Sequence, residues 1–246
     1  MIDIHCHLLP GIDDGAGNMD QALALARLAV ADGITHMVVT PHIQPGTYNN
    51  NRHSIERVFE GFKAAVAEQG IALHLAMAAE VRICPEILPM IADGSIPLFI
   101  APDGRKTLLL EFPHSHIPPG SDKMIYWLRG KGVRCLIAHP ERNKELMRNI
   151  DKLQPFLNMG CKLQVTAASV AGRFGEPPRV AAMKLLERGW VDLLATDAHN
   201  ASHRPPELKA GSLAAAAEIG VDAAGAMVTT GPWAIVGGMF EVPAQS

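Results

Sequence analysis

The amino-acid sequence predicts an α/β fold in which seven parallel strands, each followed by a helix, close or nearly close into a barrel. Apolar runs of strand length alternate with amphipathic helical runs along the 246 residues. This alternation favours parallel strands joined by right-handed crossovers. Six of the seven predicted strands end at His, Asp or Glu. Because 48% of the residues are apolar, the chain can bury one large core, and we expect residues 1–246 to form a single domain.

The strands are predicted from short apolar runs that are bounded by turn and helix signals. In chain order they span residues 1–4, 37–40, 72–79, 108–110, 133–138, 162–166 and 191–195. Near-continuous apolar runs are typical of parallel strands that are buried on both faces. The sequence therefore predicts a central sheet that helices cover.

The helices are predicted from capping signals and from apolar residues at helical spacing. Asn18 and Gln21 resemble a capping box that opens a helix over residues 19–32, which Gly33 ends. The apolar face of the second helix consists of Ile55, Val58, Phe59, Phe62 and Val66, and Gly70 ends this helix. Further helices are expected at residues 122–130, at 144–159 with a kink near Pro155, and at 180–188 with Val180, Met183 and Leu186 facing inward.

Residues that can bind metals lie at the carboxyl ends of the predicted strands. They are His5 and His7, His42, Glu80, Glu111, His139, Asp197 and His199. In a barrel the carboxyl ends of all strands meet at one face, so these side chains are expected to converge although they are far apart in the sequence. Charged groups at apolar strand ends must be paired or bound to a ligand.

The opening motif contains two histidines separated by one residue. His5 and His7 follow an apolar run, and a strand end at this point would bring both imidazoles together. Pro10 and Gly11 favour a tight reversal that returns Asp14 to the same point. A surface loop that happens to hold two histidines is the alternative interpretation of this motif alone.

Composition excludes several classes of protein. The net charge of −3 and the lack of a basic block exclude binding to a nucleic-acid backbone. The four cysteines have no C-x-x-C spacing, which is typical of reduced thiols in the cytosol. No segment has the features of a signal peptide or the roughly 20 apolar residues of a membrane span. We therefore expect a cytoplasmic protein that is not embedded in a membrane.

Several motifs together resemble the PHP (polymerase and histidinol phosphatase) superfamily. They are residues 3–15, Thr40-Pro41-His42, Ala79-Glu80, Leu110-Glu111-Phe112, Ala138-His139-Pro140-Glu141-Arg142 and Thr196-Asp197-Ala198-His199. Within this superfamily the chain is similar to the metal-dependent protein-tyrosine phosphatases of bacterial capsular and exopolysaccharide gene clusters. The resemblance implies a distorted (β/α)7 TIM-like barrel with three divalent metal ions, commonly manganese. It also implies a protein substrate, the phosphorylated tyrosine-rich tail of an autokinase that regulates polysaccharide assembly.

The resemblance also implies roles for individual residues. By matching position, His5, His7, Glu80 and Asp197 would hold the first metal, Glu80 would bridge to a second metal completed by Glu111 and His139, and Asp14, His42 and His199 would hold a third. Arg142 and Arg204 match arginines that hold phosphate. Histidinol phosphatases of the superfamily generally have a histidine at the position of Glu111, which favours the tyrosine-phosphatase branch. The family often has Asn-Pro where this chain has Gly231-Pro232, which leaves the role of the C-terminal segment open.

The chemistry of these residues points independently to phosphate-ester hydrolysis. A set of imidazoles and carboxylates without a thiolate suits Mn, Fe or Zn. Four carboxylates and three divalent ions leave a positive site that attracts an anion. A cysteine phosphatase needs Cys-x5-Arg, but the sixth residues after the cysteines are Ile12, Met90, Glu141 and Ala167.

Other readings stay open at this point. His114, His116, Arg173 and Phe174 are candidates for contact with the substrate. Another phosphoesterase of the superfamily, such as histidinol phosphatase, and a non-catalytic, metal-stabilised interaction module are the alternative functions.

Overall fold

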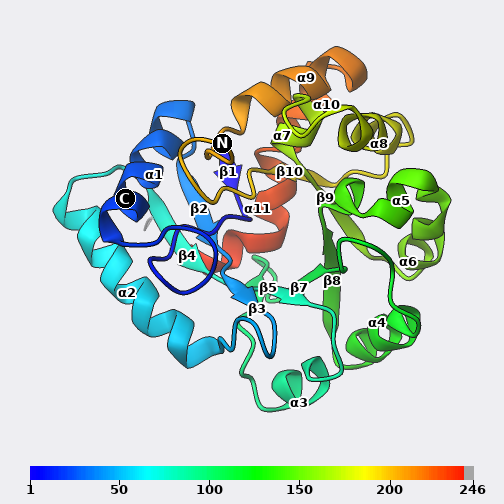
Figure 1. The fold of residues 1–246 in the computed structure, drawn as a ribbon, viewed down its shortest axis with the longest axis horizontal. Coiled ribbons are helices and arrows are strands. Elements are labelled where there is room, and N and C mark those ends of the chain that lie inside the picture. The colour runs from blue at the N-terminus through cyan, green and yellow to red at the C-terminus, as the bar shows by residue number, and fades with distance from the viewer. Residues whose placement is uncertain (241–246) are drawn as a thin grey trace.

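The computed structural model describes residues 1–240 and has the α/β architecture expected from the sequence (Figure 1). One parallel sheet has the order β1-β2-β4 and consists of Ile2–Asp3, His36–Val39 and His74–Met77. A second sheet has the order β10-β9-β8-β7-β5-β3 and consists of Leu193–Ala195, Lys162–Thr166, Val133–Ala138, Lys106–Glu111, Glu80–Arg82 and His42–Ile43. The short strand β6 (Phe99–Ile100) pairs antiparallel with β7.

The two sheets together form a distorted ring of seven strands. The chain leaves β2 and continues directly into β3, and it leaves β4 and continues into β5, so both segments pass from one sheet to the other. On the other side, His7 N–H donates to Ala198 O and Asp197 N–H donates to His5 O, both at 2.8 Å, which joins the residues after β1 to those after β10. The predicted seven-stranded barrel is therefore confirmed.

The predicted strand over residues 72–79 is shorter than expected. It is observed as β4, and Glu80 begins β5 instead of following the end of a strand. Ala78 and Ala79, both buried, separate β4 from β5 at the point where the chain changes sheets.

Helices surround the ring of strands (Figure 1). They are α1 (Met19–Asp32), α2 (Arg52–Glu68), α3 (Ile87–Ala92), α4 (Ser121–Gly130), α5 (Lys144–Arg148), α6 (Gln154–Asn158), α7 (Ala167–Val170), α8 (Glu176–Glu187), α9 (Lys209–Ile219), α10 (Val221–Ala226) and α11 (Thr230–Val236). Within residues 1–240, none of the helices is long and apolar enough to cross a membrane.

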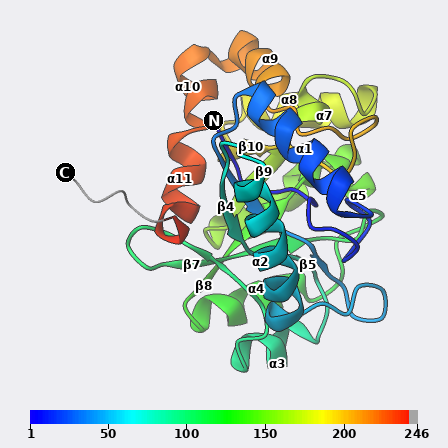
Figure 2. The same ribbon diagram turned by 90° about the vertical axis from the view of Figure 1, so that its left-hand side faces the viewer.

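Two groups of buried side chains form the core. The larger lies between the strands and the surrounding helices. The smaller includes Ile4, Val38, Leu109, Leu136 and Leu193, which come from five different strand segments, together with Ile235 and Val236 of α11. Figure 2 shows α11 on the side of the strands opposite the loop that precedes α1. Helix α11 therefore closes one end of the barrel, and Gly231-Pro232 lies in its first turn.

The first helix has the expected bounds but only half of the expected cap. Asn18 Oδ1 accepts a hydrogen bond from Gln21 N–H at 3.0 Å, and Gly33 ends the helix with φ 94°. The side chain of Gln21 accepts from Gly17 N–H instead of Asn18 N–H, so the predicted reciprocal capping box is wrong. A reciprocal box lies instead at the start of α2, between Asn51 and Ser54.

The predicted helix over residues 144–159, with a kink near Pro155, is also wrong. The segment contains α5, a 3-10 turn at Ile150–Leu153, and α6. The break occurs at Asn149, with φ −153° and ψ 95°, and its side chain accepts a hydrogen bond from Asp151 N–H. Asparagine can offer the backbone such an alternative hydrogen bond, which favours a new cap over a continuous helix. Pro155 lies in the first turn of α6, where its missing N–H costs little.

Helix α8 begins earlier than predicted, at Glu176, and two prolines occupy its first turn. Leu186 is buried and Met183 packs partly against the core, as expected. Val180 is 40% exposed, so its predicted inward orientation is wrong.

Candidate metal centre

Four buried side chains form a compact cluster at the carboxyl ends of the strands. His5 and His7 follow β1, Glu80 begins β5, and Asp197 follows β10. His5 Nε2 lies 3.3 Å from each of His7 Nε2, Glu80 Oε2 and Asp197 Oδ1. His7 Nε2 lies 3.4 Å from the same two carboxylate oxygens. We call these four residues the quartet.

The dimensions of the quartet fit a divalent metal ion. The donor atoms of His5, His7 and Glu80 lie 3.3–3.4 Å from one another, which is the separation of neighbouring ligands that are about 2.0–2.1 Å from a tetrahedral metal such as Zn²⁺. Glu80 Oε2 and Asp197 Oδ1 are buried and have no hydrogen-bond partner. Because an unsatisfied buried carboxylate oxygen is costly, their convergence on one point favours a bound cation.

Glu80 also faces a second group of candidate ligands. Its other oxygen, Oε1, lies 2.8 Å from His139 Nε2, and His139 Nε2 lies 3.9 Å from Glu111 Oε1. The two oxygens of Glu80 therefore point toward different partners, as a bridging carboxylate would.

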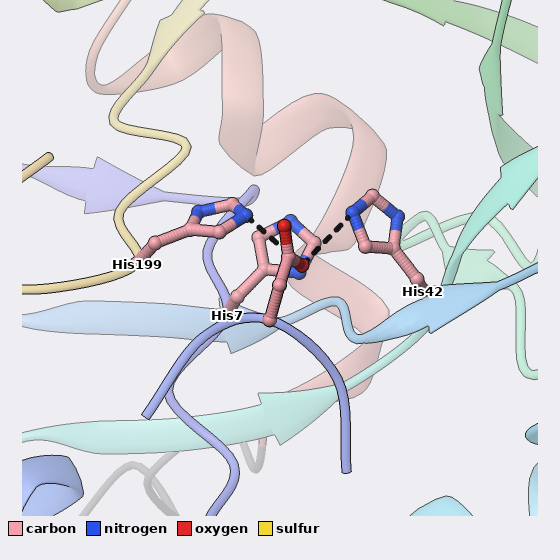
Figure 3. A group of neighbouring side chains, drawn as sticks. His7, His42 and His199 are labelled. Carbon is pink, nitrogen blue, oxygen red and sulfur yellow. Dashed lines mark ion pairs between the residues drawn. The ribbon is translucent and has the colours of Figure 1, made fainter. Parts of the chain in front are cut away.

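A third group of candidate ligands contains Asp14, His42 and His199, and Figure 3 labels the two histidines. Asp14 Oδ1 lies 3.4 Å from His42 Nε2 and 3.5 Å from His199 Nε2. Figure 3 shows His42 and His199 on either side of His7, and the ring of His7 lies 4.4 Å and 4.0 Å from their respective centroids. His42 Nδ1 lies 2.9 Å from Glu80 Oε2, so this group adjoins the quartet. The structure thus brings together all nine residues that the sequence predicted as ligands.

Residues that sequence reasoning missed hold the candidate ligands in place. His7 Nδ1 donates to Asp13 Oδ2 at 2.7 Å, and His5 Nδ1 donates to Gln164 Oε1 at 2.8 Å. Such second contacts fix the orientation of a ligating imidazole. Gln164 was detectable as a polar residue between the apolar residues Leu163 and Val165, and Asp13 as the neighbour of Asp14.

Glu111 has a partner of the same kind. Arg82 Nε donates to Glu111 Oε2 at 2.7 Å, which leaves Oε1 facing His139. Arg82 lies two residues after Glu80 on β5, and this spacing was the only sequence signal for its position.

The electrostatics of the cluster keep two of its carboxylates ionised, and neighbouring carboxylates outweigh burial and raise the pKa of His5 and His7. Burial alone would raise the pKa of Glu80, but His5 and His42 hold that pKa well below its usual range. Burial would likewise raise the pKa of Asp197, which Arg142 and His5 keep well below its usual range. Burial lowers the pKa of His199 to about 4. At neutral pH the two carboxylates are therefore ionised and His199 is neutral, as metal ligands must be.

The backbone is strained where two of the candidate ligands lie. Among residues 1–240, the non-glycine residues with positive φ are His139, at 31°, and Asp197, at 52°. Such conformations are uncommon outside glycine and cluster at functional sites. His139 directly follows β8, and Asp197 lies two residues after the end of β10.

A close backbone approach positions the loop that carries Asp13 and Asp14. A Cβ atom on Gly15 would lie only 1.9 Å from His7 O, and Ala16 N–H donates to the same oxygen at 3.1 Å. Only glycine therefore allows this turn to fold back onto His7.

Two arginines meet the centre through a single carboxylate oxygen. Arg142 and Arg204 both donate to Asp197 Oδ2. The guanidinium of Arg142 lies 5.1 Å from the ring centroid of Phe174, a cation–π contact. Arg204 Nε is buried and has no hydrogen-bond partner. Guanidinium N–H groups thus remain for an anion that reaches the centre.

The other residues predicted to contact the substrate differ in position. His114 lines a cavity of about 30 Å³ together with Glu111, His139 and Arg142. His116 is hydrogen-bonded to Ser115 instead. Arg173 forms an ion pair with Glu207, whereas its neighbour Phe174 contacts Arg142.

Comparison with known proteins identifies relatives over most of the chain. The family described as capsular polysaccharide synthesis, CpsB/CapC, matches residues 1–237. The tyrosine-protein phosphatase YwqE of Bacillus subtilis is 35% identical over 204 residues, which are 83% of this chain and 79% of YwqE. The putative tyrosine-protein phosphatase CapC of Staphylococcus aureus is 32% identical over 209 residues, 85% of this chain and 81% of CapC.

Solved structures agree with these relatives. One solved structure comes from a study of YwqE of Bacillus subtilis and CpsB of Streptococcus pneumoniae, which describes them as unique metal-dependent tyrosine phosphatases. It superposes on this chain with a TM-score of 0.88 at 31% identity, over 95% of this chain and 94% of that chain. An organophosphorus hydrolase superposes with a TM-score of 0.57 at 14% identity, over 94% of this chain and 91% of that chain, which shows a common fold only.

Proposed function

This chain belongs to the CpsB/CapC family of capsular polysaccharide synthesis, and from that membership we propose that it is a metal-dependent phosphatase that hydrolyses phosphotyrosine in proteins. Relatives named as tyrosine-protein phosphatases cover most of the chain. The observation that carries the proposal is the quartet, in which buried, unsatisfied carboxylate oxygens and imidazole nitrogens lie at the separations of ligands around one cation.

We assign the nine candidate ligands to three divalent ions. His5, His7, Glu80 and Asp197 would hold the first ion, Glu80, Glu111 and His139 the second, and Asp14, His42 and His199 the third. The short contacts of both Glu80 oxygens support a bridging role for this residue. The mixed nitrogen and oxygen donors suit Mn, with Fe and Zn as alternatives. Bound divalent ions supply Lewis acidity and lower the pKa of coordinated water toward about 7.

Arg142 and Arg204 would bind the phosphoryl group. Each guanidinium donates one N–H to Asp197, and Arg204 Nε is left buried without a partner. Planar guanidinium groups match the oxygens of a phosphate ester in a way that lysine does not. The contact with Phe174 limits the motion of the Arg142 side chain and so keeps its free N–H groups directed at the centre.

We extend the proposal to the substrate and its location. The physiological substrate would be the phosphorylated tyrosine-rich tail of an autokinase that regulates capsular or exopolysaccharide synthesis. The enzyme would act on this tail in the cytoplasm, and residues 1–246 would act as a single domain. The description of the family supports the link to polysaccharide synthesis. The four free thiols are consistent with a reducing compartment.

Metal analysis combined with a substrate panel tests the proposal. Protein purified without chelator is expected to contain divalent metal and to release phosphate from a phosphotyrosine peptide faster than from histidinol phosphate or a phosphodiester. A preference for histidinol phosphate would favour the other phosphatase branch. Metal binding without hydrolysis of any of the three substrates would favour a non-catalytic module.

A further inference from the structure

A second cavity, of about 420 Å³, lies on the outside of the barrel, away from the candidate metal centre. Its lining includes Ile91 of α3, Trp127 of α4, Lys106 of β7 and Val133 of β8. Figure 1 places α3 and α4 next to each other on the outer edge of the molecule, near β7 and β8. Lys106 and Val133 begin their strands, whereas the candidate ligands Glu111 and His139 lie at the far ends of those strands, roughly 17 Å away at the usual rise per residue.

The cavity exists because the helical layer is thin at this point. Helix α3 has 6 residues, compared with 17 in α2 and 10 in α4. A short helix covers little of the strands beneath it, so apolar side chains of the neighbouring segments remain within reach of solvent. Ile91, Leu98, Ile100 and Trp127 are half-buried, and Ile96 and Val133 are buried behind them. Contiguous apolar walls of this kind are typical of ligand sites.

Three cations and no acidic side chain complete the lining. They are Arg52, Lys106 and Lys131, and none of them forms an ion pair with any of the residues 1–240. Cations beside an apolar wall and without acidic partners attract an anion.

Two of these cations are held in place by the fold. Arg52 Nε donates to Gly94 O at 2.9 Å and Arg52 Nη2 donates to Ile96 O at 3.0 Å. Lys131 Nζ lies 5.5 Å from the ring centroid of Trp127. Because these contacts fix the charged groups before a ligand arrives, the entropic cost of binding an anion is reduced.

We propose that this cavity binds a small amphipathic anion. An acyl or aromatic body would occupy the apolar walls between α3 and α4, and a carboxylate or similar head group would contact Arg52, Lys106 and Lys131. The volume lies within the range of small-molecule sites. This site is separate from the candidate metal centre and does not depend on the proposed phosphatase function.

Titration calorimetry of the full-length protein with decanoate tests the proposal. Saturable binding of decanoate is expected, with decan-1-ol binding at least about fivefold more weakly because it lacks the charge. Ile91→Trp, which fills the cavity, and Lys131→Glu, which reverses one charge, should each weaken decanoate binding by about fivefold or more. Lys131→Arg should bind as the parent does. Phosphatase activity should be unchanged in all three variants.

Lys123→Glu is the matched control, since Lys123 lies on the exposed surface of α4 and does not line the cavity. Thermal unfolding shows whether Ile91→Trp is folded. If Ile91→Trp is unfolded, Lys131→Glu still tests the proposal, because Lys131 is exposed and its replacement does not disturb the core. Three results would each overturn the proposal: no saturable binding of decanoate, equal binding of decan-1-ol, or an equal loss of binding in Lys123→Glu and Lys131→Glu.

Discussion

Replacing Glu80 with alanine tests the assignment of the metal ligands most directly. Glu80 Oε2 lies 3.3 Å from His5 Nε2 and 2.9 Å from His42 Nδ1, and Oε1 lies 2.8 Å from His139 Nε2. The side chain is fully buried, and a water molecule that occupied its place would not supply the negative charge of the carboxylate. Removing it deprives the quartet of one corner and the second group of its bridge.

The expected magnitude follows from this double role. Loss of a residue that merely orients a metal ligand typically lowers metal affinity by about 10–100-fold. Glu80 is assigned as a direct ligand of two ions, so Glu80→Ala should lose about two of the three ions per chain and at least about a hundredfold in kcat/KM. His139→Ala should mainly deplete the second ion, because the shortest contact of His139 is the 2.8 Å separation from Glu80 Oε1, the oxygen assigned to that ion.

Elemental analysis by mass spectrometry, on protein purified without chelator, measures the ions per chain. Turnover of a phosphotyrosine peptide is measured on the same samples. Glu60→Ala, on the exposed face of α2, is the control and should leave both values unchanged. If Glu80→Ala retains the metal content and turnover of the parent protein, the assignment of Glu80 as a bridging ligand is refuted.

Three further predictions follow from the same centre. Exhaustive chelation should abolish turnover, and full activity after chelation would contradict the dependence on metal. N-ethylmaleimide should not abolish turnover, because Cys6 is buried and burial raises the pKa of Cys84 to about 11, which leaves little thiolate at neutral pH. Arg142→Lys should lower kcat/KM by roughly ten- to a hundredfold at unchanged metal content, through loss of charge-assisted hydrogen bonds. Separate measurement of kcat and KM shows whether the contact between Arg142 and the phosphoryl group strengthens in the transition state. Gly15→Ala should destabilise the fold by about 1–3 kcal/mol and lower metal content, because the added methyl would overlap His7 O; Gly61→Ala, with open space around its Cα, is the control in denaturant unfolding.

The sequence predicted the barrel and the members of the site for one physical reason. Parallel strands that are buried on both faces are continuous apolar runs, so each polar residue that follows such a run is conspicuous. His139 after β8 and Asp197 after β10 are examples. The barrel topology then places these strand ends at one face, and no contact information is needed to expect that they meet.

The missed features depend on contacts that the sequence does not encode locally. Arg82 acts on Glu111 from a neighbouring strand, and Gln164 acts on His5 from a strand more than 150 residues away in the chain. The break between β4 and β5 lies where the chain changes sheets, whereas the break between β2 and β3 contains Pro41, whose missing backbone N–H is a local signal. Asn149 is also different, because its ability to cap a new turn is a local signal that competes with the helical pattern around it.

Asp197 connects the two halves of the candidate site. Its Oδ1 belongs to the quartet, whereas its Oδ2 accepts hydrogen bonds from both Arg142 and Arg204. A phosphoryl group that binds the remaining N–H groups therefore contacts the same two guanidinium groups as Oδ2, and any shift of the carboxylate changes the donor strength of Oδ1 toward a metal. It follows that the arginines act on the metals as well as on phosphate, and that Arg142→Lys and Arg204→Lys should show coupled rather than additive losses in a double-mutant cycle. Additive losses in kcat/KM, within about 0.5 kcal/mol, would mean that the two guanidinium groups act independently and that Asp197 does not link them.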